Sequence, residues 1–91
     1  MNKQAEQLFK KGDKEAAIKL IVADLNKDPK QLPEILQLST YLVQAGDLEQ
    51  AEELLARSLE MFKNNRDLLY NLGNVYYLAD KFDKANEIFQ Q

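Results

Sequence analysis

The residue types that most often do chemistry in proteins are scarce in this chain. It contains no histidine and no cysteine, so it lacks the commonest general base, the commonest metal ligand and a thiol nucleophile. Neither a glycine-rich phosphate loop nor a G-x-S-x-G turn occurs in it. Its acidic residues lack the spacing of an EF-hand loop. The sequence therefore predicts a protein that is not an enzyme and holds no metal or other cofactor.

The charged clusters are small. Glu52-Glu53 is typical of a solvated helix face, and Lys10-Lys11 is too short for a nucleic-acid patch. With 12 basic and 15 acidic residues, the net charge of −3 gives no electrostatic drive toward phosphate backbones or anionic lipid. No segment approaches the ~18 apolar residues that cross a membrane, and the first residues lack the apolar core of a signal peptide. We expect a cytoplasmic protein that binds neither nucleic acid nor membrane.

The sequence contains a repeat of 34 residues, and the structural units that it encodes must position any functional residues. Gly12 and Gly46 are separated by this step, and Asp80 stands where a third glycine would fall. Three alanines keep the same register: Ala17, Ala51 and Ala85. A fixed period of this size indicates a stack of identical supersecondary units rather than one globular core.

Within each repeat the apolar and small residues recur at helical spacing. The two clearest stripes are Leu69, Leu72, Gly73, Tyr76 and Ile35, Leu38, Ser39, Leu42. We expect helices over residues 2–11, 14–27, 33–45, 48–63, 66–79 and 82–91, in units of about 1–31, 32–65 and 66–91. Pro33 suits a first turn, Asn65 is expected to cap a helix, and Asp47 is expected to form a capping box with Gln50.

These residues give the chain its resemblance to the tetratricopeptide repeat (TPR) family. The family pattern places Leu-Gly and then Tyr in a first helix, and Ala and Phe in a second. The third unit is most similar, through Leu72-Gly73, Tyr76, Ala85 and Phe89. The resemblance implies an all-α, right-handed superhelical stack of helix-turn-helix units, an α-solenoid. Because the third unit is short and no polar terminal helix follows it, we expect a piece of a longer repeat protein.

The resemblance also implies that the first helix of each unit lines a concave groove for a peptide or partner protein. The expected groove residues are Phe9, Leu36, Gln37, Thr40, Tyr70, Asn71, Asn74 and Tyr77. Amide side chains such as Asn71 and Asn74 donate and accept hydrogen bonds, which suits the backbone of an extended peptide. The opposing interpretation packs Phe9, Val43 and Tyr77 against the neighbouring unit. It leaves Gln37, Asn71 and Asn74 as plain solvated surface.

Some TPR proteins hold the C-terminal carboxylate of chaperones with Lys, Arg and Asn side chains on the groove helices. Here those places hold Asn2, Glu6, Asp67 and Asn71, so no such clamp is expected, and Glu6 and Asp67 would repel an acidic tail. The sequence therefore predicts a protein–protein interaction module. The alternative is a structural spacer or self-association segment, with a homodimer formed through the uncapped third unit.

Overall fold

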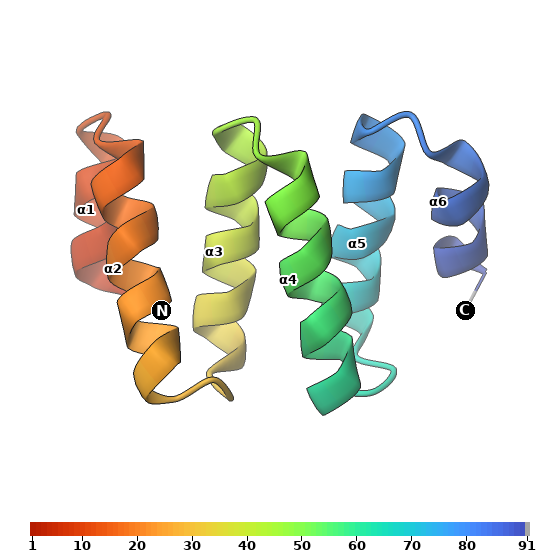
Figure 1. Cartoon of the computed structure of the whole chain (residues 1–91), viewed down its shortest axis with the longest axis horizontal. Coiled ribbons are helices and arrows are strands. Elements are labelled where there is room, and N and C mark those ends of the chain that lie inside the picture. Colours follow the sequence, from red (N-terminus) through yellow and green to blue (C-terminus); the bar gives the residue numbers. More distant parts are fainter. Residues whose placement is uncertain (91) are drawn as a thin grey trace.

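The computed structural model describes residues 1–90, and this part of the chain is helical apart from short turns (Figure 1). The helices are α1 (Lys3–Lys10), α2 (Lys14–Lys27), α3 (Leu32–Gln44), α4 (Leu48–Met61), α5 (Arg66–Leu78) and α6 (Phe82–Phe89). Each begins and ends within two residues of the bounds expected from the sequence. The prediction of an all-α fold is confirmed.

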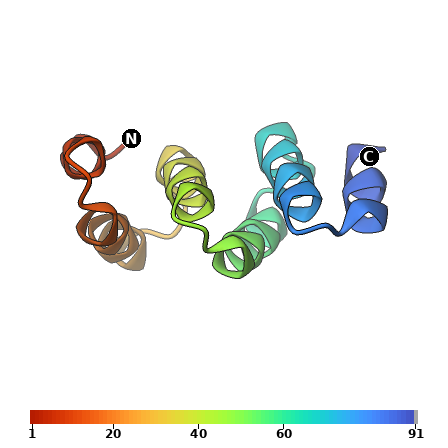
Figure 2. The same cartoon turned by 90° about the horizontal axis from the view of Figure 1, so that it is seen from above.

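The helices form an extended stack with dimensions of 35 × 25 × 15 Å. Each helix packs against the next one along the chain, and α3 also contacts α5. Seen from above, α1, α3 and α5 form one row, and α2 and α4 form a second row next to it. Helix α6 lies beside α5 (Figure 2). The result is a helical-repeat solenoid in which the first helices of the predicted units share one face.

The repeat is clearest at the turns inside the helix pairs. Gly12, Gly46 and Asp80 all have a left-handed backbone, with φ values of 94°, 84° and 61°. At each turn the residue that follows donates its backbone N–H to a carbonyl five residues earlier. The lengths are 2.9 Å from Asp13 to Leu8, 2.8 Å from Asp47 to Leu42 and 2.8 Å from Lys81 to Tyr76. This arrangement is a Schellman motif, which explains why the 34-residue step preserves Gly or Asp there.

The helix starts agree with the sequence in part. Asn65 caps α5 by accepting a hydrogen bond from the backbone N–H of Leu68 at 3.0 Å, and Pro33 lies in the first turn of α3. The capping box predicted at Asp47 is wrong, because its side chain makes no cap hydrogen bond. Asp47 contributes through its backbone instead, since its carbonyl accepts from the N–H of Ala51 at 3.1 Å.

The core runs along the contacts between helices. The repeated alanines Ala17, Ala51 and Ala85 are buried, with exposures of 0%, 0% and 2%. In α5, however, Leu68 and Val75 are more deeply buried than the Leu69 and Tyr76 of the predicted stripe. The buried surface of α5 is wider than the predicted stripe because α5 packs against α3 and α4 as well as α6.

Candidate functional site

A hollow of about 310 Å³ lies between α3 and α5, with α4 beneath it. Its lining combines apolar, hydroxyl and amide side chains: Ser39, Thr40, Val43, Gln44, Leu55, Asn71, Asn74, Val75, Tyr77 and Leu78. Leu55 and Val75 are fully buried, whereas Tyr77 and Leu78 are 60% and 54% exposed. None of the lining residues carries a charge. The hollow therefore has an apolar base and a neutral rim.

The polar groups of the hollow differ in what they can still bind. The hydroxyls of Ser39 and Thr40 donate to the carbonyl of Leu36, at 2.8 and 3.0 Å, so their donors are used within α3. Among the side-chain hydrogen bonds of residues 1–90, none involves Asn71 or Asn74. Together with the side chain of Gln44, whose backbone carbonyl alone accepts a hydrogen bond, these two amides have unused donors and acceptors at this site.

Four residues of the predicted groove meet at this hollow. Thr40 reaches it from α3, and Asn71, Asn74 and Tyr77 reach it from α5. Tyr77 also makes an edge-to-face contact with Phe82, with ring centroids 5.2 Å apart. The hollow thus collects side chains from two predicted units and links them to the start of α6.

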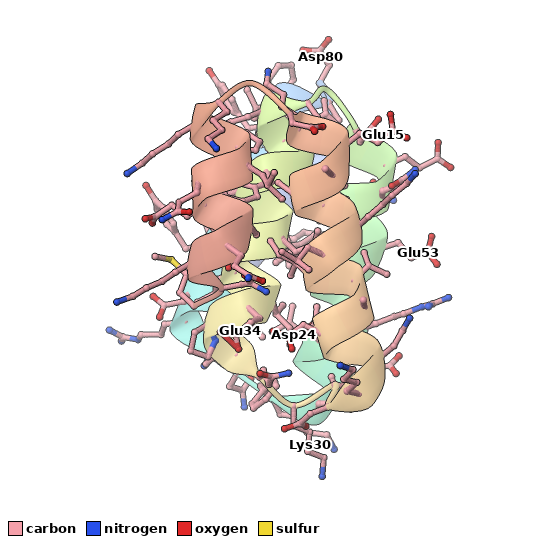
Figure 3. All side chains as sticks on the ribbon, turned by 90° about the vertical axis from the view of Figure 1, so that its left-hand side faces the viewer. Glu15, Asp24, Lys30, Glu34, Glu53 and Asp80 are labelled. Atoms are coloured by element: carbon pink, nitrogen blue, oxygen red, sulfur yellow. The ribbon has the colours of Figure 1, made fainter. Side chains whose placement is uncertain are left out.

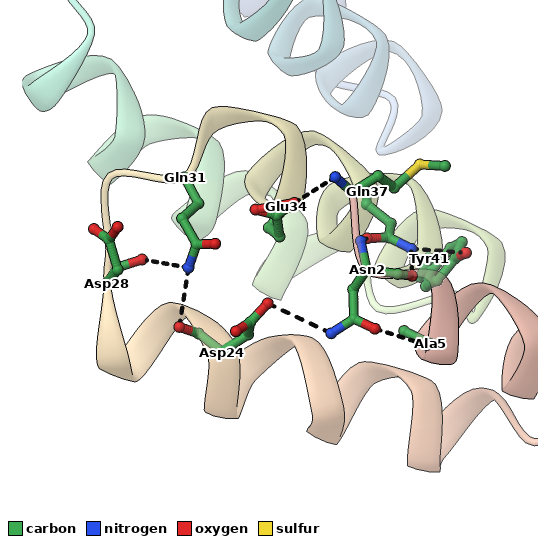
Figure 4. A network of polar contacts seen from close by, with 9 residues as sticks. Asn2, Ala5, Asp24, Asp28, Gln31, Glu34, Gln37 and Tyr41 are labelled. Carbon is green, nitrogen blue, oxygen red and sulfur yellow. Dashed lines mark hydrogen bonds and ion pairs between the residues drawn. The ribbon is translucent and has the colours of Figure 1, made fainter.

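Gln37 lies elsewhere and has a different role. It is 5% exposed, and its Oε1 accepts from the backbone N–H of Asn2 at 2.8 Å. Its Nε2 donates to the carbonyl of Asn2 at 2.8 Å and to the hydroxyl of Tyr41 at 3.2 Å (Figure 4). Because both amide donors are used inside the chain, Gln37 does not belong to an open groove. This corrects its place in the predicted set.

Phe9, Leu36 and Tyr70 also lie away from the hollow. The ring of Phe9 stacks on that of Tyr41 with centroids 3.9 Å apart and planes 8° apart, so Phe9 packs against the neighbouring helix pair. Leu36 is half-buried and packs against the core. Tyr70 is 63% exposed, and its ring centroid is 6.2 Å from that of Phe89 on α6. These three expected groove residues thus lie outside the hollow, and a groove that includes them stays a prediction.

No charged side chain lines the hollow, although the ammonium of Lys14 lies 3.5 Å from the backbone carbonyl of Gln44. Glu34 is 7% exposed, and its Oε1 is 2.6 Å from the N-terminal ammonium of Met1. Glu15 and Glu53 extend from the outer surfaces of α2 and α4 (Figure 3). Glu52 is half-buried and forms an ion pair of 3.0 Å with Lys81. The sequence pair Glu52-Glu53 is thus divided between an interhelical contact and solvent.

One tyrosine has a shifted pKa. Burial raises the pKa of Tyr76 above its ordinary value of 10.0, and the negative charge of Glu52 raises it further, while Lys81 acts in the opposite direction. Tyr76 is not one of the residues that line the hollow. Its titration therefore reports on the packing of α5 rather than on the site.

Two searches for other kinds of site concern residues 1–90. Within them, no three or more carboxylates form a group that could hold a metal ion. No helix in this part of the chain has the length and apolar character needed to cross a membrane.

Comparison with known proteins identifies the class. A family model described as Tetratricopeptide repeat matches residues 42–91, which is more than half of the chain. The chain therefore belongs to the TPR family, whose repeats are typically non-catalytic protein-interaction modules. The match includes Val43, Leu55 and all of α5, so it covers most of the hollow. A search of curated proteins finds no match.

Proposed function

We propose that this chain is a non-catalytic interaction module that binds an extended peptide segment of a partner protein across α3 and α5. The observation that carries the proposal is the uncharged hollow of about 310 Å³, with the amides of Asn71 and Asn74 at its side. An apolar recess with a few polar groups is the usual form of a binding site. A cytoplasmic location remains a prediction from the composition.

The contact between α3 and the start of α1 supplies an internal precedent for backbone recognition. There the amide of Gln37 bonds to both the N–H and the carbonyl of Asn2, each at 2.8 Å. Asn71 stands 34 residues after Gln37, at the equivalent place of the next first helix. The residue equivalent to Asn2 is Leu36 inside α3, so a peptide backbone would meet the amide of Asn71 from the hollow that this side chain lines. Asn74, one helical turn further on, offers a second contact of the same kind.

Binding by these groups has a testable signature. A library of neutral, random hexapeptides is titrated into the intact chain, and backbone resonances are followed by NMR. We expect shifts at Thr40, Asn71 and Asn74, with Asn71→Ala weakening the selected peptides about 2-fold to 10-fold, since one lost hydrogen bond is worth about 0.5–1.5 kcal/mol. Asn26→Ala, at an exposed site on α2, is the matched control and should leave binding unchanged. Equal effects of the two substitutions would contradict the proposal.

A second candidate function is self-association, favoured by the exposed side chains at one end of the stack. The large exposed apolar residues of α5 and α6 are Tyr70, Tyr77, Leu78, Phe82 and Phe89. Large exposed apolar side chains gathered on neighbouring helices commonly mark a protein contact. Two-fold pairing of these surfaces would form a homodimer. Sedimentation across a concentration series tests this function, which a constant monomer mass would exclude.

A further inference from the structure

The two contacts between successive first helices are filled differently. Between α1 and α3, the rings of Phe9 and Tyr41 stack at a centroid distance of 3.9 Å. The residues 34 positions later are Val43 and Val75, and both line the hollow between α3 and α5. The second contact therefore has two valines where the first has two aromatic rings. The hollow corresponds to the space that those rings occupy one repeat earlier.

The side chains at the rim of the hollow also differ between the two contacts, because charged residues are replaced by neutral ones. At the first contact, Glu6 and Lys10 form an ion pair of 3.7 Å on α1. Their equivalents on α3 are Thr40 and Gln44, which are neutral and line the hollow. A charged side chain entering the hollow would lose its hydration without meeting a counter-ion, which is strongly unfavourable. The hollow therefore selects for an uncharged occupant.

We propose that this hollow is a receptor for one aromatic side chain, Phe or Tyr, of the bound peptide, with Val43 and Val75 as the residues that determine this specificity. The inference rests on the proposed peptide-binding function. A dry cavity of about 150 Å³ is enough to hold benzene, so about 310 Å³ accommodates a ring together with its stem. The peptide ring takes the place that the rings of Phe9 and Tyr41 fill at the first contact.

The neighbouring amide fits the same arrangement. At the first contact, Nε2 of Gln37 holds the backbone of Asn2 and also donates to the hydroxyl of Tyr41, at 3.2 Å. At the second contact the equivalent amide is Asn71, and the Tyr41 ring is absent because Val75 replaces it. Asn71 is thus placed to hold the peptide backbone and to donate to the hydroxyl of a peptide tyrosine. The ring of an aromatic residue can pack on the apolar base, and a tyrosine hydroxyl can also accept a hydrogen bond from this amide.

The experiment transplants the rings of the first contact into the second. Peptides selected on the intact chain are compared with variants carrying Phe, Tyr, Ala or Lys at each position. We expect one position at which Phe→Ala weakens binding about 10-fold to 100-fold and Lys abolishes it. The double substitution V43F/V75Y should remove this preference. Val22→Phe, which adds a ring at an exposed site on α2, is the control and should retain it.

A second measurement keeps the inference testable if the double variant fails to fold. The small probe p-cresol is added to the unsubstituted chain, and intermolecular nuclear Overhauser effects to the methyl groups of Val43 and Val75 are recorded. Contacts to both valines support the receptor. Peptide binding without a ring preference and without these contacts would overturn the receptor but leave the peptide function. Contacts to both valines without any peptide binding would remove the peptide function instead.

Discussion

The ring of Phe89 on α6 lies against Gly73 on α5, so closely that a Cβ at residue 73 would overlap the ring. Gly73 lies in the interior of a helix, where glycine is otherwise unfavourable by about 1 kcal/mol relative to alanine. The lower helix propensity of glycine is offset here because the missing side chain leaves room for the ring of Phe89. This relationship gives physical meaning to the Leu72-Gly73 and Phe89 positions of the family pattern.

A double-mutant cycle tests the contact between Gly73 and Phe89. Gly73→Ala should lower the free energy of unfolding or leave it unchanged. The ring of Phe89 must move to admit the new Cβ, and the packing lost in this way offsets the gain in helix propensity. In a Phe89→Ala background, the same substitution should stabilise the chain by up to about 1 kcal/mol. Denaturant unfolding of the four proteins measures the coupling. Additive effects would show that the two residues do not meet.

The alanine at the centre of the second helix pair permits a simpler test. Ala51 is fully buried, so Ala51→Leu should overpack the contact between α3 and α4 and reduce the free energy of unfolding by about 1–3 kcal/mol. Ala56→Leu, at an exposed position of the same helix, is the control and should change it by less than about 0.5 kcal/mol. Thermal or urea unfolding gives both values. An unchanged stability in Ala51→Leu would mean that the site is not close-packed.

The left-handed turns predict effects of opposite sign at equivalent residues. Gly46→Ala should destabilise the chain by about 1 kcal/mol or more, because φ is 84° and a Cβ there meets no other atom, so backbone strain alone decides the outcome. Asp80→Gly should be neutral or slightly stabilising, because φ is 61° and glycine relieves that strain. Urea midpoints compare the two variants. A loss of stability in Asp80→Gly would indicate that the aspartate side chain supports the turn.

The fold was largely predictable from the sequence because its signals are local and repeated. The register of Gly12, Gly46 and Asp80 locates the turns, and helical spacing locates the helices between them. The depth of Leu68 and Val75 was missed, since periodicity within one helix does not reveal how many neighbours that helix has. The structure supplied that information through the contacts of α5.

The site was less predictable, because it depends on which side chains already have partners. Asn71 and Gln37 are equivalent in the repeat, yet Gln37 is bonded to Asn2, a residue 35 positions away. No local pattern indicates such a contact. One signal was available: the change from Phe9 and Tyr41 to Val43 and Val75 can be read directly from the 34-residue alignment. Loss of large side chains at an equivalent contact is how this sequence encodes the hollow.

The raised pKa of Tyr76 predicts how stability depends on alkaline pH. Because burial and the charge of Glu52 favour the neutral phenol in the folded chain, its contribution is fully present below the unfolded pKa, near 10. It is lost as the pH rises from there through the higher folded pKa. We expect urea midpoints to fall more steeply in the unsubstituted chain than in Tyr76→Phe above about pH 10. Tyr70→Phe, at an exposed position of the same helix, should follow the unsubstituted chain. Identical profiles for Tyr76→Phe and the unsubstituted chain would show that the phenol of Tyr76 is as well solvated in the folded chain as in the unfolded one.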